Sequence, residues 1–114
     1  MARSTQKVFE DHGMALASGD MDKVMADYAE DAILLTLDGS FVGKEAIRAF
    51  FEGTPASFPN LQITPVGLAV EGDTLILHWS ADSDTVSIPE GVDTFIIRDD
   101  KIQRQTVWIK AVPK

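Results

Sequence analysis

The sequence predicts an α+β fold in which three helices gather on one face of a curved, mixed or antiparallel sheet. Two observations predict this class. Apolar residues repeat with a helical period in the first third of the chain, and they alternate as in strands after residue 59. The expected order is helix, helix, hairpin, helix and then four longer strands. With 114 residues, the chain is expected to form a single domain over residues 1–114 with its own core.

The first helix is predicted from an apolar stripe with helical spacing, made of Val8, Phe9, His12, Ala15 and Leu16. Ser18 and Gly19 should end this helix, and Asp20 is expected to be the N-cap of a second, short helix. The inner face of that second helix would carry Met21, Val24, Met25 and Tyr28.

A hairpin, a third helix and four strands follow. AILLTL leads into Asp38-Gly39, a tight-turn signal, and then into SFVG. In KEAIRAFFEG the apolar residues share one helix face, and Gly53 is expected to end the helix. The strands are expected in NLQITPVGLAV, DTLILHWSA, VDTFIIR and KIQRQTVWIKAV, with DSDTVSIPEG as a polar loop between the second and the third.

Composition excludes several classes of function. The net charge of −8 disfavours binding to nucleic acids and anionic membranes, and without cysteine there is no thiolate chemistry. No apolar run approaches a transmembrane length and the charged start is unlike a signal peptide, so a soluble cytoplasmic protein is expected. The chain has no nucleotide-binding glycine motif or nucleophile elbow, and its two histidines lack metal-ligand spacing. Neither a cofactor nor a metal is expected.

One acidic residue stands at the start of a mostly apolar strand. In GVDTFIIRDDKI, Asp93 follows Val92 and precedes the apolar run at residues 95–97. A carboxylate in such a strand is costly unless it is paired, protonated or facing a cavity. Strand alternation puts Asp93, Phe95 and Ile97 on one face. Asp93 is therefore a candidate functional residue.

Several segments resemble, in order and spacing, those of a known superfamily. The segments are GDMDKVMADYAEDAILL, DG, GKEAIRAFF and VDTFIIRDDKI, and the likeness covers residues 8–110. They resemble the SnoaL-like and ketosteroid-isomerase-like branch of the nuclear transport factor 2-like superfamily. The resemblance implies a cone, in which a bent sheet and three helices surround a deep, mostly apolar cavity. It also implies homodimers paired through the outer face of the sheet.

The same resemblance suggests where chemistry would take place. Ketosteroid isomerases use a carboxylate base on the first strand, a tyrosine and a protonated aspartate. Matched segment by segment, Asp93 takes the place of that aspartate, His12 that of the tyrosine and Thr36 that of the base. Threonine cannot abstract a proton at neutral pH, so a plain steroid isomerase mechanism is not expected. In the last hairpin, Asp100 stands where relatives usually have glycine.

The resemblance also assigns the inward faces of the strands. The predicted substrate pocket consists of Leu34, Thr36, Leu77, Trp79, Phe95, Gln105, Val107 and Ile109, with His12 and Asp93 as the catalytic groups. An apolar pocket with few polar groups is the usual form of a small-molecule site. The outer face would carry His78, Thr106 and Trp108, and an exposed tryptophan there is a candidate dimer contact.

His12 and Asp93 each have a structural alternative. If they interact, an ionised Asp93 holds the His12 imidazole for acid–base work, whereas a protonated Asp93 donates to a carbonyl or enolate oxygen. Alternatively, His12 is a hydrogen-bonded core histidine and Asp93 caps a loop amide. Tyr28 is expected in the core with its hydroxyl at the cavity rim or in solvent, and Asp27 is expected to be solvated.

Three functions are open at this point. The first is a small cofactor-independent enzyme that isomerises, cyclises or dehydrates a hydrophobic carbonyl compound, using His12 and Asp93. The second is a non-catalytic module that holds a hydrophobic ligand or serves as a dimeric partner. The third is a hydrolase acting on an epoxide or ester, but the carboxylate and arginine expected around such a site are not seen in the sequence. The predicted partner is a hydrophobic small molecule.

Overall fold

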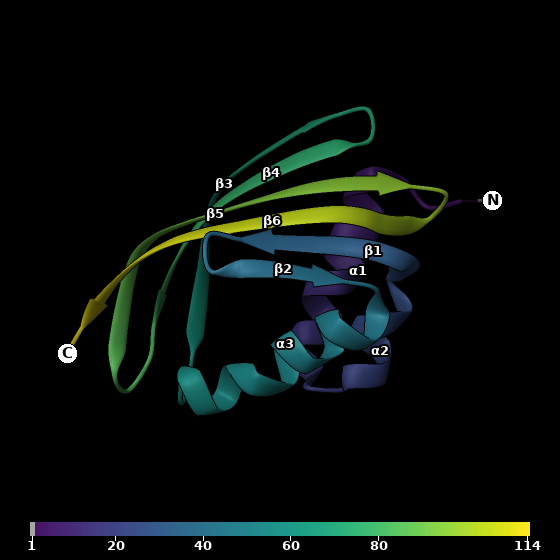
Figure 1. The fold of residues 1–114 in the computed structure, drawn as a ribbon. Coiled ribbons are helices and arrows are strands. Elements are labelled where there is room, and N and C mark those ends of the chain that lie inside the picture. Colours follow the sequence, from purple (N-terminus) through teal and green to yellow (C-terminus); the bar gives the residue numbers. More distant parts are fainter. Residues whose placement is uncertain (1) are drawn as a thin grey trace.

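The structure, a computed structural model, describes residues 2–114 as one six-stranded sheet and three helices (Figure 1). The elements are α1 (Thr5–Ser18), α2 (Met21–Ala26), β1 (Tyr28–Thr36), β2 (Gly39–Val42), α3 (Lys44–Ser57), β3 (Gln62–Glu71), β4 (Thr74–Asp82), β5 (Val86–Arg98) and β6 (Lys101–Pro113). The strand order is β2-β1-β6-β5-β4-β3. The predicted α+β class is confirmed.

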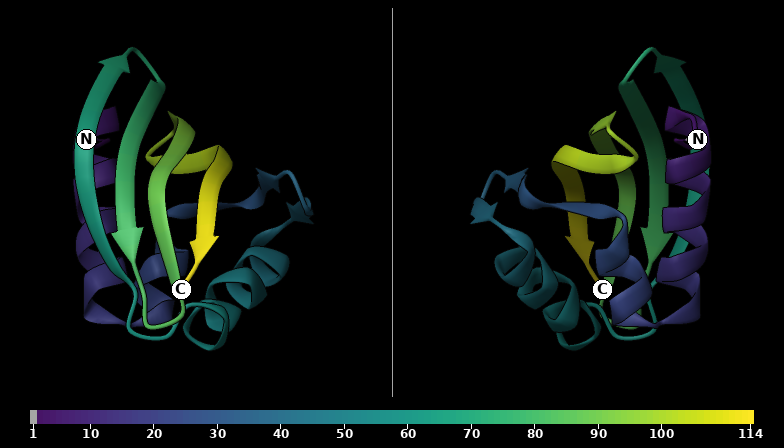
Figure 2. Two further views of the ribbon diagram at one scale, coloured as in Figure 1. Left: turned by 90° about the vertical axis from the view of Figure 1, so that its left-hand side faces the viewer. Right: turned by 90° about the vertical axis from the view of Figure 1, so that its right-hand side faces the viewer.

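The sheet is mixed and strongly bent. β1 runs parallel to β6, and the other neighbouring pairs are antiparallel. Figures 1 and 2 show the long strands β5 and β6 curving along their length, with the three helices on the same side of the sheet. The side chains on that side face the helices and are called inward here.

Local signals set the helix boundaries as expected. Ser4 accepts a hydrogen bond from the Lys7 amide at the start of α1, and Gly19 ends that helix in the left-handed conformation at φ 74°. The Asp20 carboxylate then accepts from the amides of Asp22 and Lys23, which confirms it as the N-cap of α2.

Some expected boundaries are wrong. α3 continues past Gly53 to Ser57, because Gly53 does not take the positive φ that would end it. Instead the helix ends at Phe58, whose side chain packs against a small buried cluster. Most of the polar loop expected between β4 and β5 belongs to β5, since Ile88 is buried beside Trp79 in that cluster. Tyr28 begins β1 instead of ending the helix before it.

In the last hairpin, Asp100 has the left-handed backbone conformation that glycine adopts most easily. Asp99 and Asp100 have φ values of 54° and 66°, so both residues of the turn are left-handed. Aspartate tolerates this conformation better than most residues. Asp100 has a second role, described below, because its side chain is a hydrogen-bond acceptor for the start of the chain.

Two buried apolar clusters fill the inward side, and partly exposed side chains lie between them. The larger cluster joins the three helices to β1, β4, β5 and β6, and the smaller one consists of Trp79, Ala81 and Ile88. Leu77 packs against both. Leu16, expected on the buried stripe of α1, is 40% exposed. Among residues 2–114, no helix has the length and apolar character that crossing a membrane requires.

Candidate active site

Asp93 lies in the middle of β5, flanked by the two neighbouring strands. Its register partners are Leu77 on β4 and Val107 on β6. Its Oδ1 atom accepts a hydrogen bond of 3.0 Å from the Trp79 indole, and its Oδ2 atom accepts one of 3.1 Å from the Gln105 carboxamide. The carboxyl therefore binds two side chains of the inward face, and the expectation that it might cap a loop amide is wrong.

The surroundings of Asp93 make it titrate near neutral pH. Burial disfavours the charged form and raises the pKa of Asp93 from 3.8 to about 6. The hydrogen bonds from Trp79 and Gln105 and the charge of His12 oppose this rise. A carboxyl with such a pKa is present in both protonation states close to pH 7, which suits a group that gives and takes protons.

A glycine makes room for the indole that binds Asp93. Gly91 pairs with Trp79 across β4 and β5. A Cβ atom at Gly91 would lie 2.2 Å from the Trp79 ring, closer than any real side-chain contact. Because the indole rests directly on the Gly91 backbone, its N–H is held at a fixed place beside Asp93.

His12 lies in the core at the other end of the inward face, 2% exposed. Its Nε2 atom is 3.3 Å from the Tyr28 hydroxyl, and its Nδ1 atom is 3.7 Å from Asp27 Oδ2. The second distance is that of an ion pair, and Nδ1 has no partner within hydrogen-bond reach. The ring packs edge-on against Phe51 and Phe95. His12 and Asp93 are thus joined through other residues, not by a direct hydrogen bond.

Tyr28 and Gln105 connect the two groups. The Tyr28 hydroxyl donates to Gln105 Oε1 at 2.5 Å, and Gln105 Nε2 donates to Asp93. Tyr28 is 1% exposed and Gln105 is 4% exposed. Burial, with the nearby charges of Asp93 and Asp27, raises the pKa of Tyr28 well above its usual value, so this hydroxyl keeps its proton. The result is one chain of polar contacts from Asp27 through His12, Tyr28 and Gln105 to the partly buried Asp93, and we call it the polar chain.

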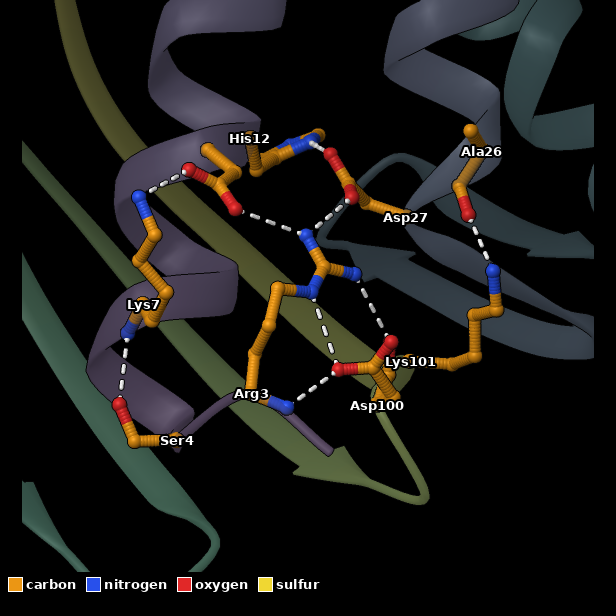
Figure 3. Close-up of polar contacts among 9 residues, drawn as sticks. Arg3, Ser4, Lys7, His12, Ala26, Asp27, Asp100 and Lys101 are labelled. Carbon is orange, nitrogen blue, oxygen red and sulfur yellow. Dashed lines mark hydrogen bonds and ion pairs between the residues drawn. The ribbon is translucent and has the colours of Figure 1, made fainter. Parts of the chain in front are cut away.

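Arg3 closes the outer end of the polar chain (Figure 3). Its Nη1 atom lies 3.1 Å from Asp27 Oδ1 and 3.1 Å from Asp11 Oδ2. Its main-chain N–H and Nε–H donate to the Asp100 carboxylate. Burial acts to raise the pKa of Asp27, but the contacts with His12 and Arg3 outweigh it and leave this pKa below its usual value. Asp27 is therefore ionised at neutral pH.

Tyr28 lies in the core as expected, but the expectations for Asp27 and for the Tyr28 hydroxyl are wrong. Asp27 is 6% exposed, not solvated, because Arg3 from before α1 and His12 from within it both point at its carboxylate. The Tyr28 hydroxyl ends on Gln105 in the core, not at a rim or in solvent. No spacing pattern could have revealed Arg3, which meets Asp27 only in the folded chain.

The other predicted pocket residues divide into three groups. Leu34 and Phe95 are fully packed in the larger cluster, while Leu77, Val107 and Ile109 remain partly exposed beside Asp93 and Trp79. The Thr36 hydroxyl is taken up in the β1–β2 turn, where it donates to the Gly39 carbonyl. The hollows found at the surface, of about 240 and 180 Å³, lie away from all of these residues.

The match to a protein-family model shows which family this chain belongs to. The model of the SnoaL-like domain matches residues 9–105, which span both ends of the polar chain. The chain belongs to the SnoaL-like family. The resemblance seen in the sequence is thereby confirmed. No curated protein matches this SnoaL-like chain.

Solved structures share the SnoaL-like fold at low identity. A candidate polyketide cyclase from Sinorhizobium meliloti is 18% identical, with a TM-score of 0.79 over 89% of this chain and 93% of that one. A candidate ketosteroid isomerase from Kribbella flavida is 16% identical, with a TM-score of 0.81 over 96% and 80%. SalBIII, an epoxide hydrolase/cyclase-like enzyme in pyran ring formation in the polyether salinomycin, is 19% identical, with a TM-score of 0.80 over 93% and 90%. These identities show a common fold alone.

Proposed function

We propose that this SnoaL-like protein is a cofactor-independent enzyme that isomerises, cyclises or dehydrates a hydrophobic carbonyl compound. The observation that carries the proposal is Asp93, a carboxyl with a pKa raised to about 6, held by two side-chain donors on the inward face. Perturbed carboxyls in such surroundings are typical of catalytic sites. Similarity to a candidate polyketide cyclase and a candidate ketosteroid isomerase supports the same chemistry.

Asp93 acts in the proposed reaction as the group that exchanges a proton with the substrate. In its neutral form the carboxyl donates to the carbonyl oxygen and stabilises the negative charge that develops there. In its ionised form it takes a proton from the carbon next to the carbonyl. The Trp79 indole keeps the carboxyl in one orientation in both forms, because its N–H donates to the oxygen that stays unprotonated.

The substrate would lie against the partly exposed apolar side chains beside Asp93. Leu77 and Val107 flank Asp93 on the neighbouring strands, and Ile109 follows on β6 opposite Gly91. These side chains offer an apolar surface next to one titratable carboxyl, which suits a hydrophobic molecule with a single polar end. His12, buried behind Tyr28, would not touch the substrate and would act on Asp93 through its charge and the polar chain.

Turnover of a panel of lipophilic ketones, enones and β-hydroxy ketones tests this proposal. Asp93→Asn should lower kcat by at least about 100-fold, since one acid–base group contributes about 10²–10⁴-fold. The matched control is Glu90→Gln, which removes a carboxylate from the exposed part of the same strand. Equal activity of the Asp93→Asn variant and the wild type would refute the catalytic role.

One observation favours a second candidate, a binding module without turnover. The first strand offers no carboxylate at Thr36, and the hydroxyl of that residue is engaged in the hairpin turn. A protein of this kind would retain a lipophilic compound during purification. Mass spectrometry of that compound before and after incubation separates the two functions, because an enzyme changes it and a binding module returns it unaltered.

A further inference from the structure

The direction of each hydrogen bond in the polar chain restricts where its protons lie. Tyr28 has one hydroxyl proton, which it donates to Gln105, so its oxygen must accept from His12. The His12 Nε2 atom therefore carries a proton. Because Asp27 is ionised, the Nδ1 atom facing it carries a proton as well. In this arrangement His12 is an imidazolium and Asp93, which accepts from both Trp79 and Gln105, is a carboxylate.

A second arrangement uses the same number of protons. Without bound substrate, a protonated Asp93 donates to the Gln105 oxygen, and the carboxamide, turned by half a rotation, donates to the Tyr28 oxygen. The Tyr28 hydroxyl then donates to Nε2 of a neutral His12, whose remaining proton stays on Nδ1 toward Asp27. Every contact is again a donor facing an acceptor. If only one of Asp93 and His12 were charged, one contact along the polar chain would join two donors or two acceptors, which is costly inside a protein.

We propose that Tyr28 and Gln105 are positioning residues that make Asp93 and His12 hold a single proton between them. When Asp93 in the free protein takes up a proton from water, the hydrogen bonds of the polar chain reverse and His12 loses its Nε2 proton to water, so the number of protons on the chain is unchanged. The role of this coupling in turnover rests on the proposed function. In that reaction His12 is positively charged while Asp93 acts as the base, and His12 is neutral when Asp93 acts as the acid. The coupling itself exists in the free protein.

The groups around the polar chain support these two states. His12 faces Asp27 from the end of α2 and Tyr28 from β1, and the other neighbours that pack on its ring are the uncharged Phe51 and Phe95. Arg3 neutralises Asp27 from outside. Asp93 faces only Trp79 from β4 and Gln105 from β6 as polar partners. Among residues 2–114, no further charged side chain forms a hydrogen bond with Tyr28 or Gln105, the middle members of the polar chain.

NMR of the two imidazoles measures the coupling without any substrate. Long-range ¹H–¹⁵N spectra report the protonation and tautomer of His12, and His78 on the outer face is an internal control. In Asp93→Asn, the new amide can donate to Gln105 but carries no charge, so it fixes the reversed arrangement. We expect His12 to be neutral with its proton on Nδ1, and its titration midpoint to fall by about one pH unit or more, because protonation of Nε2 would leave one contact with two donors.

Cutting the polar chain separates this coupling from attraction through space. Tyr28→Phe keeps the ring and removes the hydroxyl, and Gln105→Met makes the same cut at the next link. In either background, adding Asp93→Asn should shift the His12 midpoint much less than it does in the wild type. Thr106→Val, which removes an exposed hydroxyl beside Gln105 on the outer face, should leave the full shift. An equal shift in the cut and uncut proteins, or a neutral His12 protonated on Nε2, would overturn the inference.

The outcomes distinguish this inference from the proposed function. If the coupling is found and no carbonyl compound is turned over, the proposed function fails and the shared proton stands. If turnover depends on Asp93 but the midpoint shift is the same with and without Tyr28, the inference fails and the proposed function stands.

Discussion

Asp93→Asn should stabilise the folded protein at alkaline pH. The pKa of Asp93 is raised from 3.8 to about 6 in the fold, so the folded state binds protons more tightly than the unfolded chain does. Above pH 6 the carboxylate is desolvated, and the rise of its pKa from 3.8 to about 6 corresponds to a cost of about 3 kcal/mol in the free energy of folding. That cost decreases as the pH falls from 6 towards 4 and is absent below it. Asparagine keeps the shape of the side chain without the charge.

Urea unfolding at equal protein concentration measures this effect at pH 8, 6 and 4. The free energy of unfolding of the variant should exceed that of the wild type by about 3 kcal/mol at pH 8, which corresponds to roughly 10 °C in Tm. At pH 4 the two proteins should be equally stable. Glu90→Gln on the same strand should change stability little at any pH. A variant less stable than the wild type at pH 8, or a gain that does not depend on pH, would refute the argument that ionised Asp93 is destabilised by burial.

Three other predictions concern the supports of the site and the outer face. Gly91→Ala should cost about 1–3 kcal/mol in a thermal melt, because the new methyl group displaces the Trp79 ring; an unchanged Tm would contradict the close packing. Arg3→Gln should leave Asp27 with His12 as its only remaining partner among the described residues and lower the urea midpoint, with a smaller loss in high salt; equal stability at all salt concentrations would show that Arg3 is dispensable. Trp108→Lys should convert the expected homodimer to monomers in analytical ultracentrifugation, whereas an unchanged mass would exclude the outer face as the contact.

Local chemistry made much of the fold predictable from the sequence. The Asp20 cap and the Gly19 stop depend on neighbours within a few residues, and so does the turn between β1 and β2. The end of α3 did not follow from Gly53, because a glycine ends a helix only when its backbone takes a left-handed conformation. Burial of Ile88 likewise extended β5 into a segment whose composition is that of a loop.

The candidate site was predictable in its faces but not in its contacts. Alternation along β5 and β6 puts Asp93 and Gln105 on the inward side, because a strand alternates its faces with a period of two. Which polar atoms meet is a matter of distances between elements. Tyr28 stands between His12 and Gln105, residues 16 and 77 positions away in the sequence, and no pattern within the chain links them.

The two tryptophans give the molecule built-in optical probes on opposite sides of one sheet. Trp79 is 8% exposed and touches the Asp93 carboxyl, whereas Trp108 is 41% exposed on the outer face. Indole emission responds to the charge and polarity next to the ring, so Trp108→Phe leaves a single fluorophore beside Asp93. Its emission would report ionisation and ligand entry in real time, without any attached dye.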